Sequence, residues 1–355
     1  MCGIAGIMTR SGAPPDDAIL QALSAALAHR GPDGQGRVIS GGTGLAQTRL
    51  AIIDLETGDQ PLFASQNTGK EEVGTGLGAA GVSPGTPRPR TGTGKAALIA
   101  NGEIYNYVEL KLDMGRVEFR TGSDCEPPLH LYLRHGLDFT RHLRGMYAIA
   151  IYDPAEDSLV LARDPFGIKP LYYAETAEGL AFASEPQALF RAGLVKPVLR
   201  PEARDELLQL QFTTGAGTVF EGVYRLLPGE TVQVRDGRIT DRLSRKALPQ
   251  GGPIEVSPSA ALHRLDEVLS DSVNIHQRSD VPYGMFLSGG IDSSALLAMM
   301  SRLNEHPVRA FTAGFSGAHV ADERGQARAV AEAAGAEHTA VEFSEADFWA
   351  LLPHI

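Results

Sequence analysis

The second residue of the chain is a cysteine whose chemistry depends on its place after the initiator methionine. A thiol with an ordinary pKa of about 8.5 is mostly protonated at neutral pH and needs a base before it can attack a carbonyl. Removal of Met1, which the small residues Cys2 and Gly3 favour, would expose an α-amino group with a pKa of about 7.7–8.0 on the same residue. Cys2 could then attack an amide or ester while its own amine moves the proton. The alternative is that Cys2 is a small apolar residue that begins a buried strand.

Five further polar or glycine positions could complete such a site. An attack on a carbonyl creates an oxyanion that needs hydrogen-bond donors, and Asn101-Gly102 offers an amide side chain beside a glycine N–H. Glu103 and Asp124 are carboxylates suited to an ammonium group, while Arg49 can bind a carboxylate in a bidentate manner. Together these side chains could hold an amino acid by both ends. Taken singly, each has an ordinary explanation, since Asn-Gly is a common turn and a lone arginine is usually a solvated surface charge.

A second candidate site lies in Ser288-Gly289-Gly290-Ile291-Asp292-Ser293-Ser294, between an apolar strand and an expected helix. The glycines let backbone N–H groups approach a phosphate, and the helix N-terminus attracts its negative charge. The serines add donors, and Asp292 can hold a magnesium ion beside a pyrophosphate group. Because no lysine follows, the pattern disfavours a Walker-type site for a γ-phosphate. The alternative is a serine-glycine turn that only caps a helix.

Composition limits the class of protein. A length of 355 residues suggests about two domains, and 43% hydrophobic with 21% charged residues is typical of folded proteins, which excludes a mainly disordered chain and a coiled coil. The net charge of -11 without a Lys/Arg cluster argues against nucleic acid as a partner. We find neither a membrane span nor a signal peptide and therefore expect a cytoplasmic protein. Two cysteines and ten unpaired histidines predict no disulfide framework and no metal other than magnesium.

The N-terminal part reads as short strands in succession with a few helices. Such an order favours two sheets covered by helical layers rather than βαβ alternation. The Gly-, Thr- and Pro-rich segment Asn67–Lys95 is expected to form a surface loop. The expected strands are 3–8, 49–54, 97–101, 147–152, 158–163 and 179–184, and the expected helices are 16–28 and 126–134.

The pattern changes after the Gly/Pro-rich stretch Leu248–Pro258, which we interpret as a linker. Helices and strands then alternate, which predicts a parallel sheet with helices on both faces. We expect this domain to be incomplete, since the chain stops in or just after its last helix. The expected strands are 283–287, 308–313 and 338–341, and the helices are 262–273, 293–303, 323–334 and one near Ala346.

Several stretches within about the first 185 residues resemble the glutaminase half of glutamine-dependent asparagine synthetases, and they follow one another in the order found in that family. These enzymes are class II (N-terminal nucleophile) amidotransferases. The flanks of the serine-glycine loop, Val281-Pro282-Tyr283-Gly284 and Ala310-Phe311-Thr312-Ala313-Gly314-Phe315, resemble the ATP domain of the same family. The N-terminal stretches are Met1-Cys2-Gly3-Ile4, His29-Arg30-Gly31-Pro32-Asp33, Arg49-Leu50-Ala51-Ile52-Ile53-Asp54, Asn101-Gly102-Glu103-Ile104-Tyr105-Asn106, Gly122-Ser123-Asp124-Cys125-Glu126, the run Arg163–Tyr172 and Ala183-Ser184-Glu185.

The resemblance implies a fold class and a domain plan. It implies an α+β N-terminal domain, a layered αββα sandwich, followed by a partial α/β parallel-sheet domain of the pyrophosphatase-loop type that binds ATP. On this basis we expect a glutaminase domain at 1–200, a connecting segment and linker at 201–258, and an apparently incomplete ATP-binding domain at 259–355.

The resemblance also implies residue roles. Cys2 would be the nucleophile, and Asn101 and Gly102 would form the oxyanion hole. Asp292 would be the magnesium ligand. The residues implied around glutamine are Arg49, Leu50, Ile52, Ile53, Asn101, Gly102, Glu103 and Asp124, and those implied around ATP are Leu287, Ser288, Gly289, Gly290, Asp292, Ser293, Ser294 and Ala313.

The implied activity consists of two half-reactions. Glutamine would be hydrolysed to glutamate and ammonia, and ammonia would displace AMP from an ATP-activated carboxylate, which is aspartate in the best-known members. The resemblance also implies Mg²⁺ as a cofactor and a homodimer as a candidate assembly. The family's second loop, Ser-Gly-Glu-Gly, is not found in residues 295–355, so we do not expect the 355 residues of this chain alone to make asparagine. Alternatives are another carboxylate acceptor, a truncated chain with glutaminase activity only, or a non-catalytic sensor or subunit.

Overall fold

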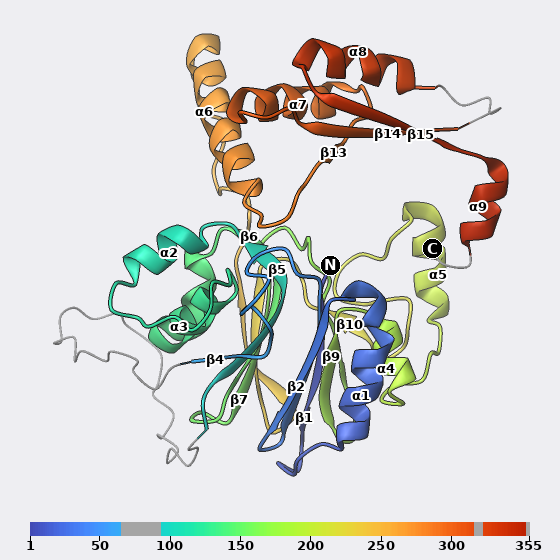
Figure 1. Ribbon diagram of the computed structural model, residues 1–355. Coiled ribbons are helices and arrows are strands. Elements are labelled where there is room, and N and C mark those ends of the chain that lie inside the picture. Colours follow the sequence, from blue (N-terminus) through green and yellow to red (C-terminus); the bar gives the residue numbers. More distant parts are fainter. Residues whose placement is uncertain (65–93, 316–321, 353–355) are drawn as a thin grey trace. The chain divides into compact units, whose positions relative to one another are not determined.

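The computed structural model describes residues 1–64, 94–315 and 322–352. The chain divides into two compact units, Met1–Gln250 and Gly251–Ile355 (Figure 1). The expected surface loop Asn67–Lys95 lies outside the described residues apart from Gly94 and Lys95. No helix in the described ranges is long and apolar enough to cross a membrane.

The first unit contains two six-stranded antiparallel sheets. One has the strand order β10-β8-β9-β1-β3-β2, and the other has the order β12-β11-β7-β6-β5-β4. The strands of the first sheet are β1 (Gly3–Thr9), β2 (Gly34–Ser40), β3 (Thr43–Arg49), β8 (Tyr172–Glu175), β9 (Gly179–Ala183) and β10 (Tyr224–Arg225). Those of the second are β4 (Leu62–Phe63), β5 (Ala97–Ile104), β6 (Gly145–Asp153), β7 (Ser158–Arg163), β11 (Glu230–Arg235) and β12 (Arg238–Ser244).

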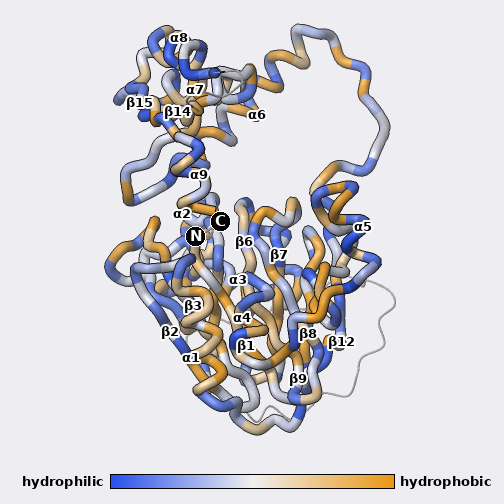
Figure 2. Tube along the Cα trace, turned by 90° about the vertical axis from the view of Figure 1, so that its right-hand side faces the viewer, coloured by the Kyte–Doolittle hydropathy of each residue, from blue (hydrophilic) through white to orange (hydrophobic). Residues whose placement is uncertain are grey.

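Alternation along the strands builds a four-layer sandwich, which confirms the predicted αββα fold class. On β1, Ile4 faces the other sheet and packs in one core with Ile99 of β5, whereas Ile7 points to the opposite side and packs against Leu20 of α1. Helices α1 (Asp17–Ala26) and α4 (Pro186–Arg191) cover the first sheet, and α2 (Tyr107–Asp113) and α3 (Glu126–His135) cover the second (Figure 1). In Figure 2 hydrophobic residues recur along the strands of this unit. Cys125 is buried in the core beneath α3.

Two expectations for this unit were wrong. The apolar run Arg49–Asp54 was expected to be a strand, but β3 ends at Arg49 and a loop follows. Asp54 adopts a left-handed backbone conformation with φ of 55°, which no extended strand permits. The segment 201–258 was expected only to connect domains, but β11 pairs with β7 and β10 pairs with β8, so both sheets continue into it. Val232 and Val234 join the core between the sheets. The segment also carries α5 (Pro201–Leu210).

The second unit contains the parallel sheet β13-β14-β15 and its crossover helices. Ala310 of β14 is buried against Leu297 of α7 and Ala327 of α8, while Phe311 and Phe315 on the other face are 37% and 51% exposed. Helices on both faces were expected, but α7 and α8 lie on one face, because right-handed crossovers that advance in one direction place both helices on the same side. The elements are α6 (Pro258–His276), β13 (Met285–Phe286), α7 (Ile291–Leu303), β14 (Arg309–Phe315), α8 (Arg324–Ala334), β15 (Glu337–Phe343) and α9 (Glu345–Leu351).

Candidate active site

Cys2 lies directly before β1, the strand that pairs with both β3 and β9. Its Sγ accepts a hydrogen bond from the Leu50 N–H at 3.3 Å, and its carbonyl accepts one from Arg30 Nε at 2.9 Å. The next residues are also tied down, because the Ile4 N–H donates to Ser184 Oγ at 3.0 Å. The thiol is therefore held at the end of a central strand rather than on a mobile terminus.

The electrostatics around Cys2 make a nearby base necessary. Burial raises the pKa of the thiol, and the carboxylates of Glu103 and Asp124 add to the effect, whereas the hydrogen bond from Leu50 lowers it. The α-amino group of Met1 behaves in the opposite way, because burial lowers its pKa and the charges of Arg30 and Lys169 lower it further. A protonated thiol thus lies close to an amine that readily loses its own proton.

Asn101 and Gly102 lie on β5, whose inner face meets β1 in the core between the sheets. Asn101 is 1% exposed, and its Nδ2 has no hydrogen-bond partner within the described residues. A buried donor without an acceptor is costly, so this amide is suited to receive an oxygen from a ligand. At Gly102 a Cβ atom would lie 2.4 Å from the Met146 carbonyl oxygen, so only glycine fits this approach to β6.

Glu103 and Asp124 form a pair of inward carboxyl groups. Asp124 is 4% exposed, and its Oδ2 accepts the Ile104 N–H at 2.7 Å. Burial, together with the charge of Asp124, raises the pKa of Glu103 to about 8, and burial raises the pKa of Asp124 to about 6. The pair therefore holds a proton at neutral pH until a cation, such as an ammonium group, compensates its charge.

This raised pKa gives a stability prediction for Glu103→Gln. The pKa of Glu103 in the folded chain lies above its unfolded value, so the stability this group contributes is full below its unfolded pKa and is lost as pH rises through about 8. We expect Glu103→Gln to raise Tm at pH 9 by roughly 2–4 °C, the shift that about 1 kcal/mol produces in a domain of this size, and to leave Tm unchanged at pH 4. Calorimetry at both pH values checks this. The exposed control Glu118→Gln should show no such pH dependence, and an unchanged or lower Tm at pH 9 would contradict the expectation.

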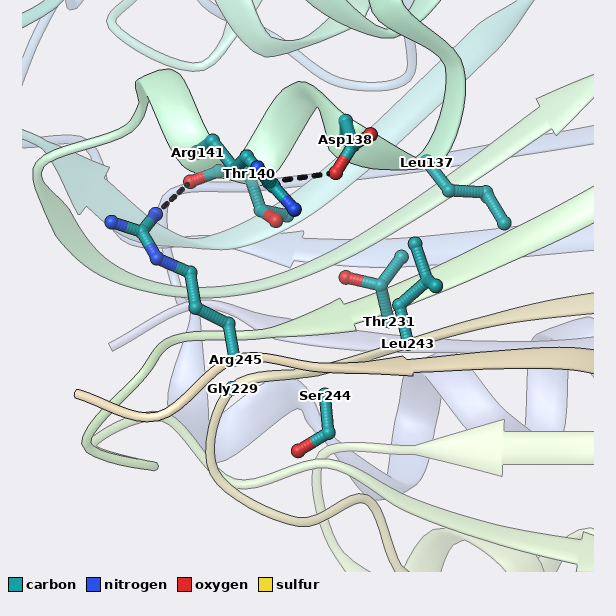
Figure 3. Close-up of a pocket in the computed structure, with 9 residues that line it drawn as sticks. All are labelled: Leu137, Asp138, Thr140, Arg141, Gly229, Thr231, Leu243, Ser244 and Arg245. Carbon is teal, nitrogen blue, oxygen red and sulfur yellow. Dashed lines mark hydrogen bonds and ion pairs between the residues drawn. The ribbon is translucent and has the colours of Figure 1, made fainter. Parts of the chain in front are cut away.

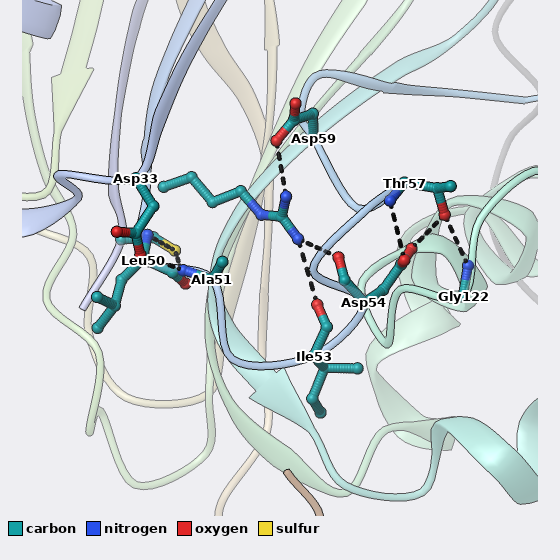
Figure 4. Close-up of polar contacts among 10 residues, drawn as sticks. Asp33, Leu50, Ala51, Ile53, Asp54, Thr57, Asp59 and Gly122 are labelled. Carbon is teal, nitrogen blue, oxygen red and sulfur yellow. Dashed lines mark hydrogen bonds and ion pairs between the residues drawn. The ribbon is translucent and has the colours of Figure 1, made fainter. Parts of the chain in front are cut away.

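Arg49 lies at the end of β3, not at the start of a strand as expected. Its guanidinium is 2.7 Å from Asp59 Oδ1 and donates to the carbonyl oxygens of Ile53, at 3.3 Å, and Asp54 (Figure 4). Asp59 is the exposed member of this ion pair, with a side chain that is 80% exposed. Arg49 thus fixes the loop that follows β3, and the Asp59 carboxylate that pairs with it is largely exposed to solvent.

The loop after β3 surrounds the thiol and reaches the turn before Asp124. The Ala51 N–H donates to Asp33 Oδ2 at 2.9 Å, and the hydroxyl of Thr57 accepts the Gly122 N–H at 3.3 Å (Figure 4). Ile53 is buried, whereas Leu50 and Ile52 are half-buried. The first unit therefore gathers Cys2, Leu50, Glu103 and Asp124 into one neighbourhood, with Arg49 bracing its loop.

Lys169 and Arg30 were not singled out as site residues from sequence. Lys169 is 5% exposed at the end of a turn that Asp164 organises, because the Asp164 carboxylate accepts the N–H groups of Phe166, Ile168 and Lys169, each at 3.0 Å. The signal available in the sequence was a lysine inside the run Arg163–Tyr172, one of the stretches that resemble the family.

In the second unit the loop 288–294 is bound together by its own side chains. Ser288 Oγ lies 3.0 Å from Ser293 Oγ and accepts the Gly290 N–H at 3.2 Å. Gly289 has a φ of 76° and lies against α8, where its Cβ would be 3.0 Å from the Ala327 nitrogen. Gly289 therefore provides a bare backbone at the N-terminus of α7, an arrangement suited to phosphate.

The remaining predicted ATP residues flank that loop. Leu287 is 1% exposed, and its N–H donates to the Phe311 carbonyl at 2.8 Å, while Ala313 is exposed on β14. Asp292 is exposed in the first turn of α7. No group of three metal-binding side chains occurs in residues 1–64, 94–315 and 322–352. A single carboxylate fits a Mg²⁺ ion that is carried by phosphates and waters rather than held in a protein cage.

A cavity of about 280 Å³ lies elsewhere in the first unit and contains none of the predicted site residues (Figure 3). Its polar groups pair with one another: Arg141 lies 2.8 Å from Asp138, and Arg245 donates to the Thr140 carbonyl at 3.2 Å. The lining residues are Leu137, Asp138, Thr140, Arg141, Gly229, Thr231, Leu243, Ser244 and Arg245. We assign no ligand to it.

The sandwich of two antiparallel sheets, with a cysteine at the head of a central strand and a glutamine amidotransferase domain matched over residues 1–71 and 82–245, defines a class II amidotransferase of the N-terminal-nucleophile type. Residues 264–355 match the asparagine synthase family. The chain belongs to the family of glutamine-hydrolysing asparagine synthetases.

Three relatives illustrate the similarity. The chain is 32% identical to asparagine synthetase 1 of Bacillus subtilis, over 100% of this chain and 52% of the relative. It is 35% identical to a putative asparagine synthetase of Mycobacterium tuberculosis H37Rv, over 100% and 54%, and 33% identical to asparagine synthetase B of Escherichia coli K12, over 79% and 41%. The chain thus spans about half the length of these relatives.

Proposed function

We propose that the first unit hydrolyses glutamine to glutamate and ammonia at Cys2. The observation that carries this proposal is the buried Nδ2 of Asn101, a donor without a partner in the described residues, on the strand that faces the strand of Cys2. An amide carbonyl attacked by the thiol would supply the missing acceptor.

The reaction would proceed by nucleophilic catalysis. Removal of Met1 frees the α-amino group of Cys2, which takes the thiol proton as sulfur forms a bond to the side-chain carbonyl carbon of glutamine. The oxyanion would accept hydrogen bonds from Asn101 Nδ2 and the Gly102 N–H. The ammonium then returns its proton to the departing nitrogen, which leaves as ammonia. Water cleaves the thioester that remains, releases glutamate and restores the thiol.

Glutamine would be held by both ends of its backbone. Its α-carboxylate would displace the exposed Asp59 from Arg49, and its ammonium would lie against Glu103 and Asp124, whose shared proton it would expel. Leu50, Ile52 and Ile53 would pack along the methylene groups of the substrate.

The second half-reaction is proposed for the loop 288–294 with Leu287 and Ala313 around ATP. An acceptor carboxylate, most simply aspartate, would attack the α-phosphate of ATP, form an acyl-adenylate and release pyrophosphate, and ammonia would then displace AMP. Mg²⁺, held by Asp292 and the phosphates, would neutralise the negative charge of the leaving pyrophosphate. A cytoplasmic location and a homodimer belong to the same proposal, as does the synthesis of asparagine by the whole protein.

The direct test is an assay of the purified full chain with glutamine. We expect equal amounts of glutamate and ammonia, and an intact mass that lacks Met1. A protein that retains Met1, or that releases no glutamate although the thiol is free, would refute the proposal. Adding ATP, Mg²⁺ and aspartate in a second assay, with pyrophosphate as the readout, tests the other half-reaction separately.

The role of Asp292 gives a prediction for ATP binding. Because its carboxylate would touch the metal and not the nucleotide, Asp292→Asn should weaken binding of Mg²⁺-ATP about 10-fold and leave binding of ATP in EDTA unchanged. Titration calorimetry with and without Mg²⁺ measures both affinities. Glu332→Gln, an exposed substitution on α8, is the control and should change neither. If the substitution weakened ATP binding equally with and without Mg²⁺, Asp292 would have a structural role in α7 and would not be a magnesium ligand.

A further inference from the structure

Lys169 is a buried cation next to the N-terminus, and the mechanism above gives it no task. Its side chain is 5% exposed, and its Nζ donates to Met1 Sδ at 3.4 Å. A thioether is a weak acceptor, whereas an ammonium group carries three donors and a full charge. This partner belongs to the residue that would be removed, so after removal the ammonium would lie beside the new N-terminus and not beside a side chain.

The charged groups around this point come from several elements. Arg30 donates to the Cys2 carbonyl from the turn after α1, and Asp33 follows in the next loop. Glu103 comes from β5, and Asp124 comes from the turn before α3. Lys169 comes from the turn after β7, where Asp164 accepts its backbone N–H at 3.0 Å. The two cations and three carboxylates thus face one amine and one thiol.

We infer that Lys169 is a positioning residue for the proposed glutaminase step, whose ammonium keeps the α-amine of Cys2 in its neutral form and favours the thiolate over the thiol. This inference rests on the proposed function, since it assigns the amine as the base. A positive charge beside an amine disfavours a second positive charge, and beside a thiol it favours a negative one. The first effect keeps the amine free to accept a proton, and the second lowers the cost of forming the thiolate, and neither requires a bond to the substrate.

The electrostatic directions agree with this geometry. The charge of Lys169 lowers the pKa of the Met1 α-amino group, one residue before the amine of Cys2, and the charges of Cys2 and Glu103 in turn raise the pKa of Lys169 against the effect of its burial. Glu103 and Asp124 oppose the thiolate, so a nearby cation is needed to offset them. Arg30 contributes in the same direction, but its guanidinium is engaged by Glu185 at 2.6 Å and by the Cys2 carbonyl.

The test compares Lys169→Met, Lys169→Arg and the exposed control Lys196→Met in the full chain. The first readout is the rate of Cys2 alkylation by iodoacetamide against pH, followed by peptide mass, which requires no turnover. Cys125 is 4% exposed and serves as the internal unreactive site. We expect the midpoint for Lys169→Met to rise by about one pH unit, so that alkylation at pH 7 falls about 10-fold, while Lys169→Arg restores the wild-type midpoint and Lys196→Met leaves it unchanged.

The second readout is the pH profile of kcat/KM for glutamine. In Lys169→Met the midpoint of its acid limb should shift to higher pH by about the same amount. A lower rate without any shift of either midpoint would overturn the inference and leave Lys169 a structural residue. If the wild-type protein hydrolyses no glutamine but the alkylation midpoint still shifts, the proposed function fails while the effect of Lys169 on the thiol stands. Thermal melting of each variant shows whether the substituted chain is folded.

Discussion

Cys2→Ala is expected to abolish glutamine hydrolysis, with kcat at least about 10⁴-fold lower and Tm close to that of the wild-type protein. The loss is large because the thiol supplies the bond-forming atom, and no other group in the neighbourhood can replace it. The stability change is small because the side chain is only partly buried, and the backbone contacts to Arg30 and Ser184 do not involve the thiol. Release of glutamate, measured in a coupled assay, checks the result.

Cys125 offers a matched control for this substitution. It is 4% exposed in the core under α3, and its thiol hydrogen-bonds to the Asp124 side chain. Cys125→Ala should therefore keep kcat within a few-fold of wild type and cost about 1 kcal/mol of stability through the lost hydrogen bond and the small cavity. The two variants should thus show opposite patterns. Cys2→Ala should lose activity and keep its stability, and Cys125→Ala should keep activity and lose stability. Turnover by Cys2→Ala close to the wild-type rate would exclude Cys2 as the nucleophile.

The second large effect is expected for Asn101→Ala. Removing one oxyanion donor typically lowers kcat 10²–10³-fold, and here KM for glutamine should change little, because the hydrogen bond forms with the oxyanion rather than with the substrate. The absence of a partner for Nδ2 in the described residues means that the substitution breaks no hydrogen bond of that group. We therefore expect only a minor change in Tm. Steady-state kinetics with glutamine gives kcat and KM separately.

Asn106 provides the contrasting variant. Its Nδ2 donates to the His142 carbonyl at 2.9 Å and its Oδ1 accepts the Arg144 N–H at 2.9 Å, so Asn106→Ala loses two structural hydrogen bonds. It should destabilise the chain by about 1–2 kcal/mol while kcat stays within a few-fold of wild type. If Asn101→Ala instead lowers stability strongly and raises KM with kcat unchanged, Asn101 is a structural or ground-state contact and not an oxyanion donor.

Much of the fold could be predicted from periodicity, and the errors have local causes. The run Leu50-Ala51-Ile52-Ile53 has the composition of a strand, yet Arg49 hydrogen-bonds to the carbonyls at its end and bends it into a loop. That interaction is tertiary, and no window of sequence displays it. Strand β12 was missed because it is an exposed edge with polar residues at most positions, and β10 because two residues have no period.

Some residues of the candidate site could be predicted from local sequence, and others could not. Cys2, Asn101-Gly102 and Asp124 each occur in a short local pattern whose chemistry can be interpreted alone. Lys169 has no such pattern, because its meaning comes from a contact with a residue 168 positions earlier in the chain. Arg30 is similar, since a lone arginine is an ordinary surface residue until it is found donating to the backbone of the nucleophile.

Asp164 does not touch the proposed substrate, yet it determines where the charge of Lys169 is placed. One carboxylate, 0% exposed, gathers the N–H groups of Phe166, Ile168 and Lys169, and the Tyr147 N–H of β6 donates to it at 3.3 Å. In a saturation screen scored by turnover, position 164 would therefore group with position 2, although it takes no part in bond making. Loss of turnover on substitution of Asp164 would show that the residue positions Lys169 for the proton transfer. Turnover alone would wrongly assign Asp164 a catalytic role.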